Sequence, residues 1–293
     1  MNIELSQYLK TAEQQSERLS SKALTPKEIT QFRNTIYLYF SEFGRKLPWR
    51  ETNDPYRILV SEIMLQQTQV DRVLPKYQNF VGKFPDISSL AIAPFQEVLT
   101  SWQGLGYNRR ALSLHKSARI ILEEFDGTIP KDIEDLIKLP GIGHATASEI
   151  AAFAYGIPNA FLETNIRTVY IYFFYKDRDD ITDGELLPFV EKTLDQADPR
   201  NWYYALMDYG VMLKKQYGNP GRKSRHYAIQ SPFRGSDREI RGAILRLLSQ
   251  NTIMNEEEFY TELSFEKQRI KRLLTILEKE GFITSQKQQY TIY

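Results

Sequence analysis

A glycine-rich turn between two helical patterns has the residue types that bind a phosphate. It reads LPGIG over residues 139–143, where Pro140 ends the preceding helix and the two glycines let backbone N–H groups approach a ligand closely. The helix that follows begins with exposed amides and a partial positive charge, which attract an anion. The residues that would contact the phosphate are Gly141, Gly143, His144 and Ala145. The alternative is a tight helix–helix turn that binds nothing.

A carboxyl group stands at the start of another helical pattern, twenty positions after Gly143. The segment is Glu163-Thr164-Asn165, and the helix dipole at such a position favours a charged carboxylate. A phosphate-binding turn followed by a carboxylate at a helix N-terminus predicts an enzyme that acts on DNA.

A second carboxyl group, Glu62, lies inside an apolar pattern that predicts one long helix from Tyr56 to about Leu74. Burial among apolar neighbours would raise the pKa of this carboxyl, so that it could stay protonated near neutral pH and act as an acid. The alternative is a glutamate that faces water while its neighbours are buried. Gln66 and Gln67 follow, and their amides are suited to contact bases or backbone.

A second glycine turn, GLG over residues 104–106, precedes an aromatic residue and two arginines. Tyr107 could insert beside a base, and Arg109 or Arg110 could bind a phosphate. The alternative is an ordinary helix turn with a tyrosine in the core.

Composition excludes several classes of protein. The 293 residues include no cysteine, which excludes disulfides, zinc–thiolate sites, cysteine-ligated iron–sulfur clusters and a cysteine nucleophile. The charged N-terminus lacks a signal-peptide pattern and no apolar run is long enough to span a membrane, so we expect a cytoplasmic protein. We also expect a monomer. The net charge is only +1, but residues 214–246 hold nine Lys/Arg against two acids, which favours a polyanion partner over a merely solvated basic loop.

The remaining patterns predict an all-α protein in three parts. Residues 1–25 form an N-terminal arm, residues 26–230 a helical domain, and residues 231–293 a winged helix-turn-helix. The last part has helical patterns at 237–248, 256–263 and 265–279, then alternating segments at 281–284 and 290–293 that predict two strands. Such a module could bind DNA through its third helix or serve protein contacts instead.

Four motifs occur in the order found in one known superfamily. They are LPW at 47–49, SEIMLQQTQV at 61–70, GLGY at 104–107 and LPGIG at 139–143. Over residues 26–220 the chain resembles the helix-hairpin-helix DNA glycosylases, and among them the adenine glycosylases of the MutY type. The resemblance implies two helical lobes with double-stranded DNA between them, recognition of a mismatch or lesion, base flipping, and hydrolysis of the N-glycosidic bond.

The resemblance also implies residue roles. Glu62 matches the glutamate that protonates the base and later handles water, and Glu163 matches the aspartate that stabilises the positively charged sugar. Gln67 and Tyr107 match positions that intercalate or hold the strand. The glycine turn matches the phosphate-binding hairpin, whose backbone carbonyls, at Leu139 and Gly141, can hold a monovalent cation. Ala145 stands where lyase-competent relatives keep a lysine, so no amine is there for a Schiff base and we expect a monofunctional enzyme that leaves an abasic site.

Three departures from the family pattern change what we expect. The family holds an iron–sulfur cluster through four cysteines after its last helix, but residues 214–226 have none, so we expect no cluster and a basic loop that packs or grips DNA without metal. Glu163 is one methylene longer than the family's aspartate, a displacement of about an ångström that can lower a rate considerably. A winged helix stands where adenine glycosylases have a domain that reads oxidised guanine.

The expected substrate is therefore adenine opposite guanine or oxidised guanine. Two alternatives stay open at the level of the sequence. One is removal of a deaminated base, such as uracil, thymine or hypoxanthine, from a mispair. The other is a non-catalytic DNA-binding scaffold, which would have no need of a carboxyl inside an apolar helix.

Overall fold

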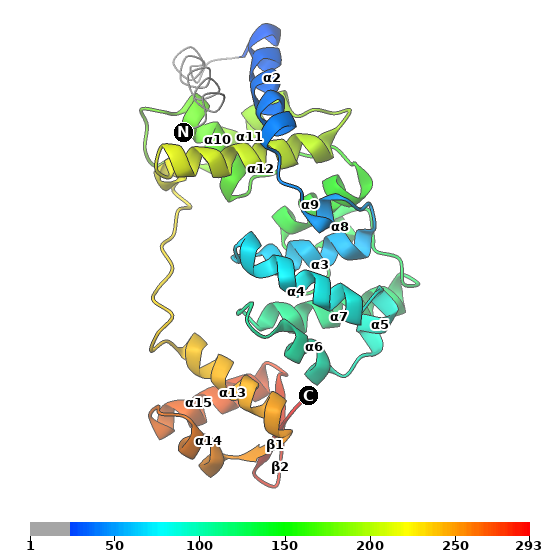
Figure 1. Ribbon diagram of the computed structural model, residues 1–293, viewed down its shortest axis with the longest axis vertical. Helices are drawn as coiled ribbons and strands as arrows, with labels where there is room; N and C mark the ends of the chain where they lie inside the picture. The colour runs from blue at the N-terminus through cyan, green and yellow to red at the C-terminus, as the bar shows by residue number, and fades with distance from the viewer. Residues whose placement is uncertain (1–23) are drawn as a thin grey trace. The chain divides into compact units, whose positions relative to one another are not determined.

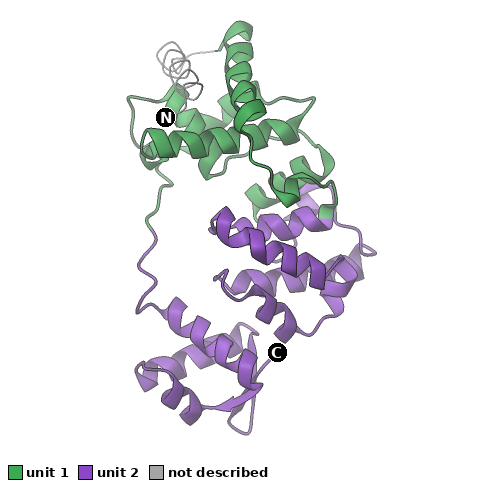
Figure 2. Cartoon of the chain, viewed as in Figure 1, with its two compact units in different colours: residues 1–55, 143–229 green, residues 56–142, 230–293 purple. Residues whose placement is uncertain are grey.

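The computed structural model describes residues 24–293 and divides the chain into two compact units (Figure 2). Unit 1 comprises the residues up to Pro55 and Gly143–Ile229, and unit 2 comprises Tyr56–Ile142 and Gln230–Tyr293. The described residues are mostly helical, with one small sheet, which confirms the all-α prediction. Most of the predicted N-terminal arm, residues 1–23, lies outside the described residues. No helix in residues 24–293 is both long and apolar enough to cross a membrane.

Unit 1 is built around helices α10 and α12, which pack against each other, with α2 against α12 (Figure 1). Its elements are α2 (Pro26–Phe43), η1 (Pro48–Arg50), α9 (His144–Tyr155), α10 (Thr164–Phe174), α11 (Asp183–Thr193), α12 (Pro199–Gln216) and η2 (Pro220–Lys223). Helix α2 begins where the sequence predicts, because Thr25 and Glu28 form a reciprocal capping box ahead of its first turn. In the core, the Phe32 ring lies 5.0 Å from Phe173 and 5.9 Å from Trp202, centroid to centroid. Burial of each such ring contributes about 1.5–3 kcal/mol.

The first part of unit 2 is a set of short helices that carry three of the four motifs. They are α3 (Pro55–Leu65), α4 (Val70–Lys83), α5 (Ile87–Ile92), α6 (Phe95–Trp102), α7 (Arg109–Glu124) and α8 (Ile133–Leu136). The prediction of one helix from Tyr56 to Leu74 is wrong, because α3 ends at Leu65 and α4 starts at Val70. Gln67 lies between them with a φ of 53°, in the left-handed region, which a right-handed helix cannot contain.

The C-terminal part of unit 2 consists of three helices and a three-stranded sheet. The elements are α13 (Asp237–Asn251), β1 (Ile253–Asn255), α14 (Glu256–Glu262), α15 (Lys267–Lys279), β2 (Ile283–Gln286) and β3 (Gln289–Ile292). The two predicted strands pair as an antiparallel hairpin, and β1, which the sequence did not reveal, joins β3 to give the order β1-β3-β2. Helix α13 packs against α6, and the Phe282 ring lies 6.1 Å from that of Phe95. The domain boundary near residue 231 remains a prediction.

Candidate active site and nucleic-acid interface

Glu62 is buried in α3, with only 6% of its surface exposed. Its neighbours Ile58 and Leu59 on the same helix are fully buried. The alternative of a water-facing carboxyl is therefore wrong. The Ser61 hydroxyl donates to the Ile58 carbonyl at 2.8 Å and lies 3.3 Å from Glu62 Oε1. Helix α3 thus holds the Glu62 carboxyl group in largely apolar surroundings.

The segment between α3 and α4 is held by Arg110, a residue that the sequence suggested only as a phosphate ligand. The Arg110 guanidinium donates to the carbonyls of Ile63, Met64 and Gln66, at 2.5–3.0 Å, and to Thr68 Oγ1 at 2.8 Å. It also reaches the Gly106 carbonyl at 3.2 Å. The side chain is buried, and burial lowers the pKa of Arg110 to about 10, so it remains charged at neutral pH. Arg110 is a structural residue, and the phosphate role suggested for it is wrong.

Gln67 and Tyr107 both adopt a left-handed backbone conformation, with φ of 53° and 49°. Such a conformation is uncommon outside glycine and gathers at functional sites. Gln230 links the two side chains, because its Nε2 donates to Gln67 Oε1 at 3.1 Å and also to the Tyr107 hydroxyl. Arg238 donates to the same hydroxyl at 3.1 Å. Gln67 and Tyr107, to which the resemblance assigns contact with the DNA strand, therefore lie close together in unit 2. The Gln67 side chain is exposed and that of Tyr107 is half-buried.

Arg109 forms an ion pair with Glu280, Nη2 to Oε1, at 2.5 Å. Arg241 binds the other oxygen of the same carboxylate at 2.5 Å, and this hydrogen bond is the main cause that lowers the pKa of Glu280. The Arg109 side chain is 69% exposed. Its predicted contact with a phosphate stays a prediction, and in DNA-free protein its partner is Glu280 on the C-terminal part of the chain.

The first glycine of the LPGIG turn is required by the backbone. Gly141 has a φ of 80°, and a Cβ built there would lie 2.7 Å from the Cβ of Ser113. Ser117 Oγ donates to the Pro140 carbonyl at 2.9 Å and Gln66 Nε2 donates to the Gly141 carbonyl at 3.1 Å. The turn is therefore hydrogen-bonded to α7 through Ser117 and to Gln66, which lies one helical turn after Glu62.

The proposed cation ligands of the turn are its carbonyl oxygens. The Leu139 carbonyl accepts from the Ile142 N–H at 3.2 Å, while that of Gly141 accepts from Gln66. Each oxygen keeps a second lone pair. The monovalent cation site stays a prediction.

The second glycine of the turn is not required by the backbone. Gly143 has a φ of −89°, a value that any residue adopts, and a Cβ there would meet nothing within 4 Å. It is the N-cap of α9, and Gly143, His144 and Ala145 are all exposed. No side chain among the described residues forms an N-cap hydrogen bond to this helix. The exposed N-terminus of α9 has the properties of an anion-binding site.

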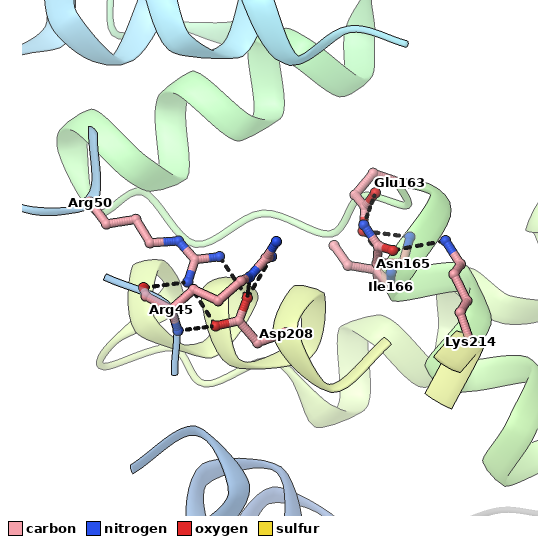
Figure 3. A network of polar contacts seen from close by, with 7 residues as sticks. All are labelled: Arg45, Arg50, Glu163, Asn165, Ile166, Asp208 and Lys214. Atoms are coloured by element: carbon pink, nitrogen blue, oxygen red, sulfur yellow. Dashed lines mark hydrogen bonds and ion pairs between the residues drawn. The ribbon is translucent and has the colours of Figure 1, made fainter. Parts of the chain in front are cut away.

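Glu163 caps helix α10, as Figure 3 shows. Its Oε1 accepts from the backbone N–H groups of Asn165 at 2.6 Å and Ile166 at 2.7 Å, and its Oε2 accepts from Asn165 Nδ2 at 3.2 Å. The sequence prediction of a carboxylate at a helix N-terminus is confirmed. Lys214 Nζ donates to Asn165 Oδ1 at 2.8 Å, a contact that the sequence did not reveal because the two residues are 49 positions apart.

A second polar cluster in unit 1 fixes the LPW motif (Figure 3). Asp208 on α12 is 3% exposed and accepts from the guanidinium groups of Arg45 and Arg50, at 2.6–3.0 Å, and from the Arg45 N–H at 2.8 Å. The Arg50 guanidinium lies 4.4 Å from the centroid of the Tyr204 ring. A buried carboxylate that is paired in this way holds the loop after α2 onto α12.

The basic segment at residues 214–226 belongs to unit 1 and packs against the residues around Ile181. Ile181 N–H donates to the Lys223 carbonyl at 3.0 Å, and Arg225 N–H donates to the Ile181 carbonyl at 2.9 Å. The Arg225 side chain pairs with Asp180. Within residues 24–293 no group of three or more His, Asp or Glu side chains is placed to hold a metal ion, and the sequence has no cysteine, so the residues present do not fit an iron–sulfur cluster.

Comparisons with known proteins agree with this geometry. The sequence matches the HhH-GPD superfamily of base excision DNA repair proteins over residues 60–265. It is 37% identical to an adenine DNA glycosylase of Buchnera aphidicola (subspecies Baizongia pistaciae) over 187 residues, which are 62% of this chain and 52% of that protein. It is 33% identical to the adenine DNA glycosylase of Mycolicibacterium smegmatis over 238 residues, 73% of this chain and 79% of that protein.

Solved structures show the same fold. A thermostable thymine-DNA glycosylase aligns with a TM-score of 0.60 at 26% identity, over 66% of this chain and 91% of that one. A trapped endonuclease III–DNA covalent intermediate aligns with a TM-score of 0.51 at 22% identity, over 72% of this chain and 92% of that one.

The chain belongs to the HhH-GPD superfamily of base excision DNA repair proteins. The curated relatives named above are adenine DNA glycosylases, which confirms the resemblance drawn from the four motifs. The chain spans about half the length of some of these relatives, 52% of the Buchnera aphidicola protein quoted above.

Proposed function

We propose that this protein is a monofunctional DNA glycosylase that flips a mispaired or damaged base out of double-stranded DNA and removes it by hydrolysis. The observation that carries the proposal is the burial of Glu62 in the apolar helix α3. Burial of a carboxyl group costs free energy and favours its protonated form, and a protonated carboxyl group can serve as a general acid. Membership of a base excision repair superfamily supports the same conclusion.

The proposed reaction divides between two carboxyl groups. The protonated Glu62 carboxyl gives its proton to a ring nitrogen of the base, and the electron pair of the bond between sugar C1′ and the base nitrogen leaves with the base. The sugar becomes an oxocarbenium-like cation, which the Glu163 carboxylate stabilises. Water then adds to C1′ and gives a proton to the Glu62 carboxylate, which regenerates the acid. The products are the free base and an abasic site.

Glu163 suits the stabilising role because donors hold its carboxylate in place. Its two oxygens accept from two backbone N–H groups and one side-chain amide at the start of α10. A carboxylate fixed in this way needs little reorganisation when positive charge develops on the sugar.

DNA contact is proposed for two exposed features. The start of α9, at Gly143, His144 and Ala145, would bind a backbone phosphate, and Gln67 with Tyr107 would enter the duplex beside the target base. Gln66 and Asn165 are also proposed to contact DNA, beside the hydrogen bonds that Gln66 makes to the Gly141 carbonyl and Asn165 makes to the Glu163 carboxylate. The structures to which this fold is similar include a DNA complex, which supports a DNA partner.

Adenine opposite guanine or oxidised guanine is the proposed substrate, because the curated relatives are adenine DNA glycosylases. Thymine in a mispair is the second candidate, and the similarity to a thymine-DNA glycosylase structure favours it. A panel of duplexes with adenine, uracil, thymine or hypoxanthine opposite each partner base decides between them. Release of free adenine alone supports the first proposal, and release of thymine from a guanine mispair replaces it.

The absence of lyase activity is proposed from Ala145, which offers no amine for a Schiff base. After incubation with a substrate duplex, strand breaks should appear only on treatment with alkali. Breaks without alkali, or a DNA adduct trapped by borohydride, would show that another amine serves as a nucleophile.

A further inference from the structure

Lys214 is a basic side chain in contact with the polar network at Glu163 (Figure 3). It lies in the last turn of α12, where its Nζ is 2.8 Å from Asn165 Oδ1. The amide nitrogen of the same Asn165 side chain is 3.2 Å from Glu163 Oε2. A single amide group therefore connects a lysine to the proposed catalytic carboxylate.

The order of donors and acceptors along this connection has only one consistent arrangement. An ammonium group only donates, and a carboxylate only accepts. Between Lys214 and Glu163, the Asn165 amide must therefore turn its oxygen to the lysine and its NH2 to the glutamate. With no donor at position 214, the amide could rotate by half a turn and place its oxygen against the carboxylate, where the two would repel.

The second carboxylate oxygen depends on this amide. Oε1 accepts from two backbone N–H groups, whereas Oε2 accepts from the Asn165 side chain. A glutamate has one more rotatable bond than an aspartate, so a cap on Oε1 alone leaves the carboxylate plane free to turn. Orientation of Oε2 then depends on the orientation of the amide.

The environment of Lys214 fits a residue that is held in place for a purpose. Its side chain is partly buried, and burial lowers the pKa of the ammonium, while the nearby Glu163 charge opposes that shift. Lys215, the next residue, is exposed on the same helix and offers a matched control.

We propose that Lys214 is a positioning residue: by fixing the orientation of the Asn165 amide, it holds the Glu163 carboxylate in the orientation that stabilises the sugar cation. The inference rests on the proposed function of Glu163. It gives one residue of the basic segment at residues 214–226 a role at the site, in addition to the packing described above.

The experiment measures single-turnover base release and duplex Kd for wild type, Lys214→Met, Lys214→Arg and Lys215→Met. Lys214→Met should slow base release by about 10- to 100-fold, the scale that ångström misplacement carries, and leave Kd within about two-fold, well under the ten-fold that 1.4 kcal/mol represents. Lys214→Arg keeps the donor and should recover most of the rate, and Lys215→Met should match wild type. In a cycle with Asn165→Ala, the double variant should be no slower than Asn165→Ala alone.

A second readout does not need activity. The Asn165 side-chain NH2 resonances of the free protein, identified by their loss in Asn165→Ala, should shift and lose exchange protection in Lys214→Met but not in Lys215→Met. Unchanged resonances, or an unchanged rate in a folded and active Lys214→Met variant, overturn the inference. If wild type releases no base from any duplex in the panel, the proposed function fails, and the resonances still decide whether Lys214 orients the amide.

Discussion

The two glycines of the LPGIG turn should respond to alanine in opposite ways. Gly141 has a φ of 80° and Gly143 a φ of −89°. An alanine Cβ at position 141 would lie 2.7 Å from Ser113 Cβ, whereas one at position 143 would meet nothing within 4 Å. Gly141→Ala should therefore destabilise the fold, whereas Gly143→Ala should weaken only the binding of DNA.

The magnitudes follow from these contacts. At position 141 the left-handed backbone costs about 1–2 kcal/mol for alanine, and the clash with Ser113 adds about 1–3 kcal/mol. The sum, a loss of about 2–5 kcal/mol, corresponds to a fall in Tm of roughly 4–20 °C in a chain of this size. At position 143 the loss of conformational freedom in the unfolded chain, worth about 0.4–1 kcal/mol, roughly offsets the poor N-cap propensity of alanine.

Thermal unfolding and duplex binding measure the two effects separately. Gly143→Ala should keep the Tm of wild type within a few degrees, but it should weaken duplex binding by about ten-fold, or 1.4 kcal/mol, because its methyl group stands where a phosphate would approach the amides of α9. Wild-type affinity in Gly143→Ala would refute phosphate binding at this turn. A wild-type Tm in Gly141→Ala would refute the steric reasoning about Ser113.

Three further predictions concern unit 2. Arg110→Met should lower the free energy of unfolding by about 3 kcal/mol or more, since each buried carbonyl left without a donor costs roughly 1–3 kcal/mol. Denaturant unfolding measures this change. A loss below about 1 kcal/mol would show that the C-terminus of α3 needs no cap. Arg238→Ala removes a hydrogen bond to the Tyr107 hydroxyl, and should weaken binding of a mispaired duplex several-fold with little change in Tm; equal affinity in a titration would show that Tyr107 needs no support. The pKa of Glu280 is lowered from 4.5, chiefly by the hydrogen bond from Arg241. The contribution of this carboxylate to stability is therefore present at neutral pH and is lost as the pH falls below about 4.5 through the folded-state pKa. Glu280→Gln should be less stable than wild type at pH 7 and equally stable in acid, and a stability difference that does not change with pH would contradict the ion pair.

The sequence predicts those features that depend on neighbouring residues. The burial of Glu62 follows from apolar positions at helical spacing around it. The cap by Glu163 follows from a carboxylate directly before a helical pattern. The hairpin of β2 and β3 follows from two alternating segments separated by a short turn.

Features that depend on distant residues could not be predicted. The break after Leu65 interrupts a continuous apolar pattern, and the carbonyls that end α3 are bound by Arg110, 44 positions beyond Gln66. The contacts of Asp208 with Arg45 and Arg50 cross about 160 positions of sequence, and no local pattern reports such a pair. The left-handed conformations of Gln67 and Tyr107 are likewise imposed by their surroundings, because neither residue type favours that region.

The central claim is that Glu62 supplies the proton for base release, and Glu62→Gln tests it most directly. The substitution keeps the size of the side chain and removes the acid, so it should slow single-turnover base release by about 10²- to 10⁴-fold, the usual contribution of general acid catalysis. Duplex affinity and Tm should stay close to those of wild type, because the amide fills the same buried space in α3. Base release by Glu62→Gln at a rate within a few-fold of wild type would contradict the claim.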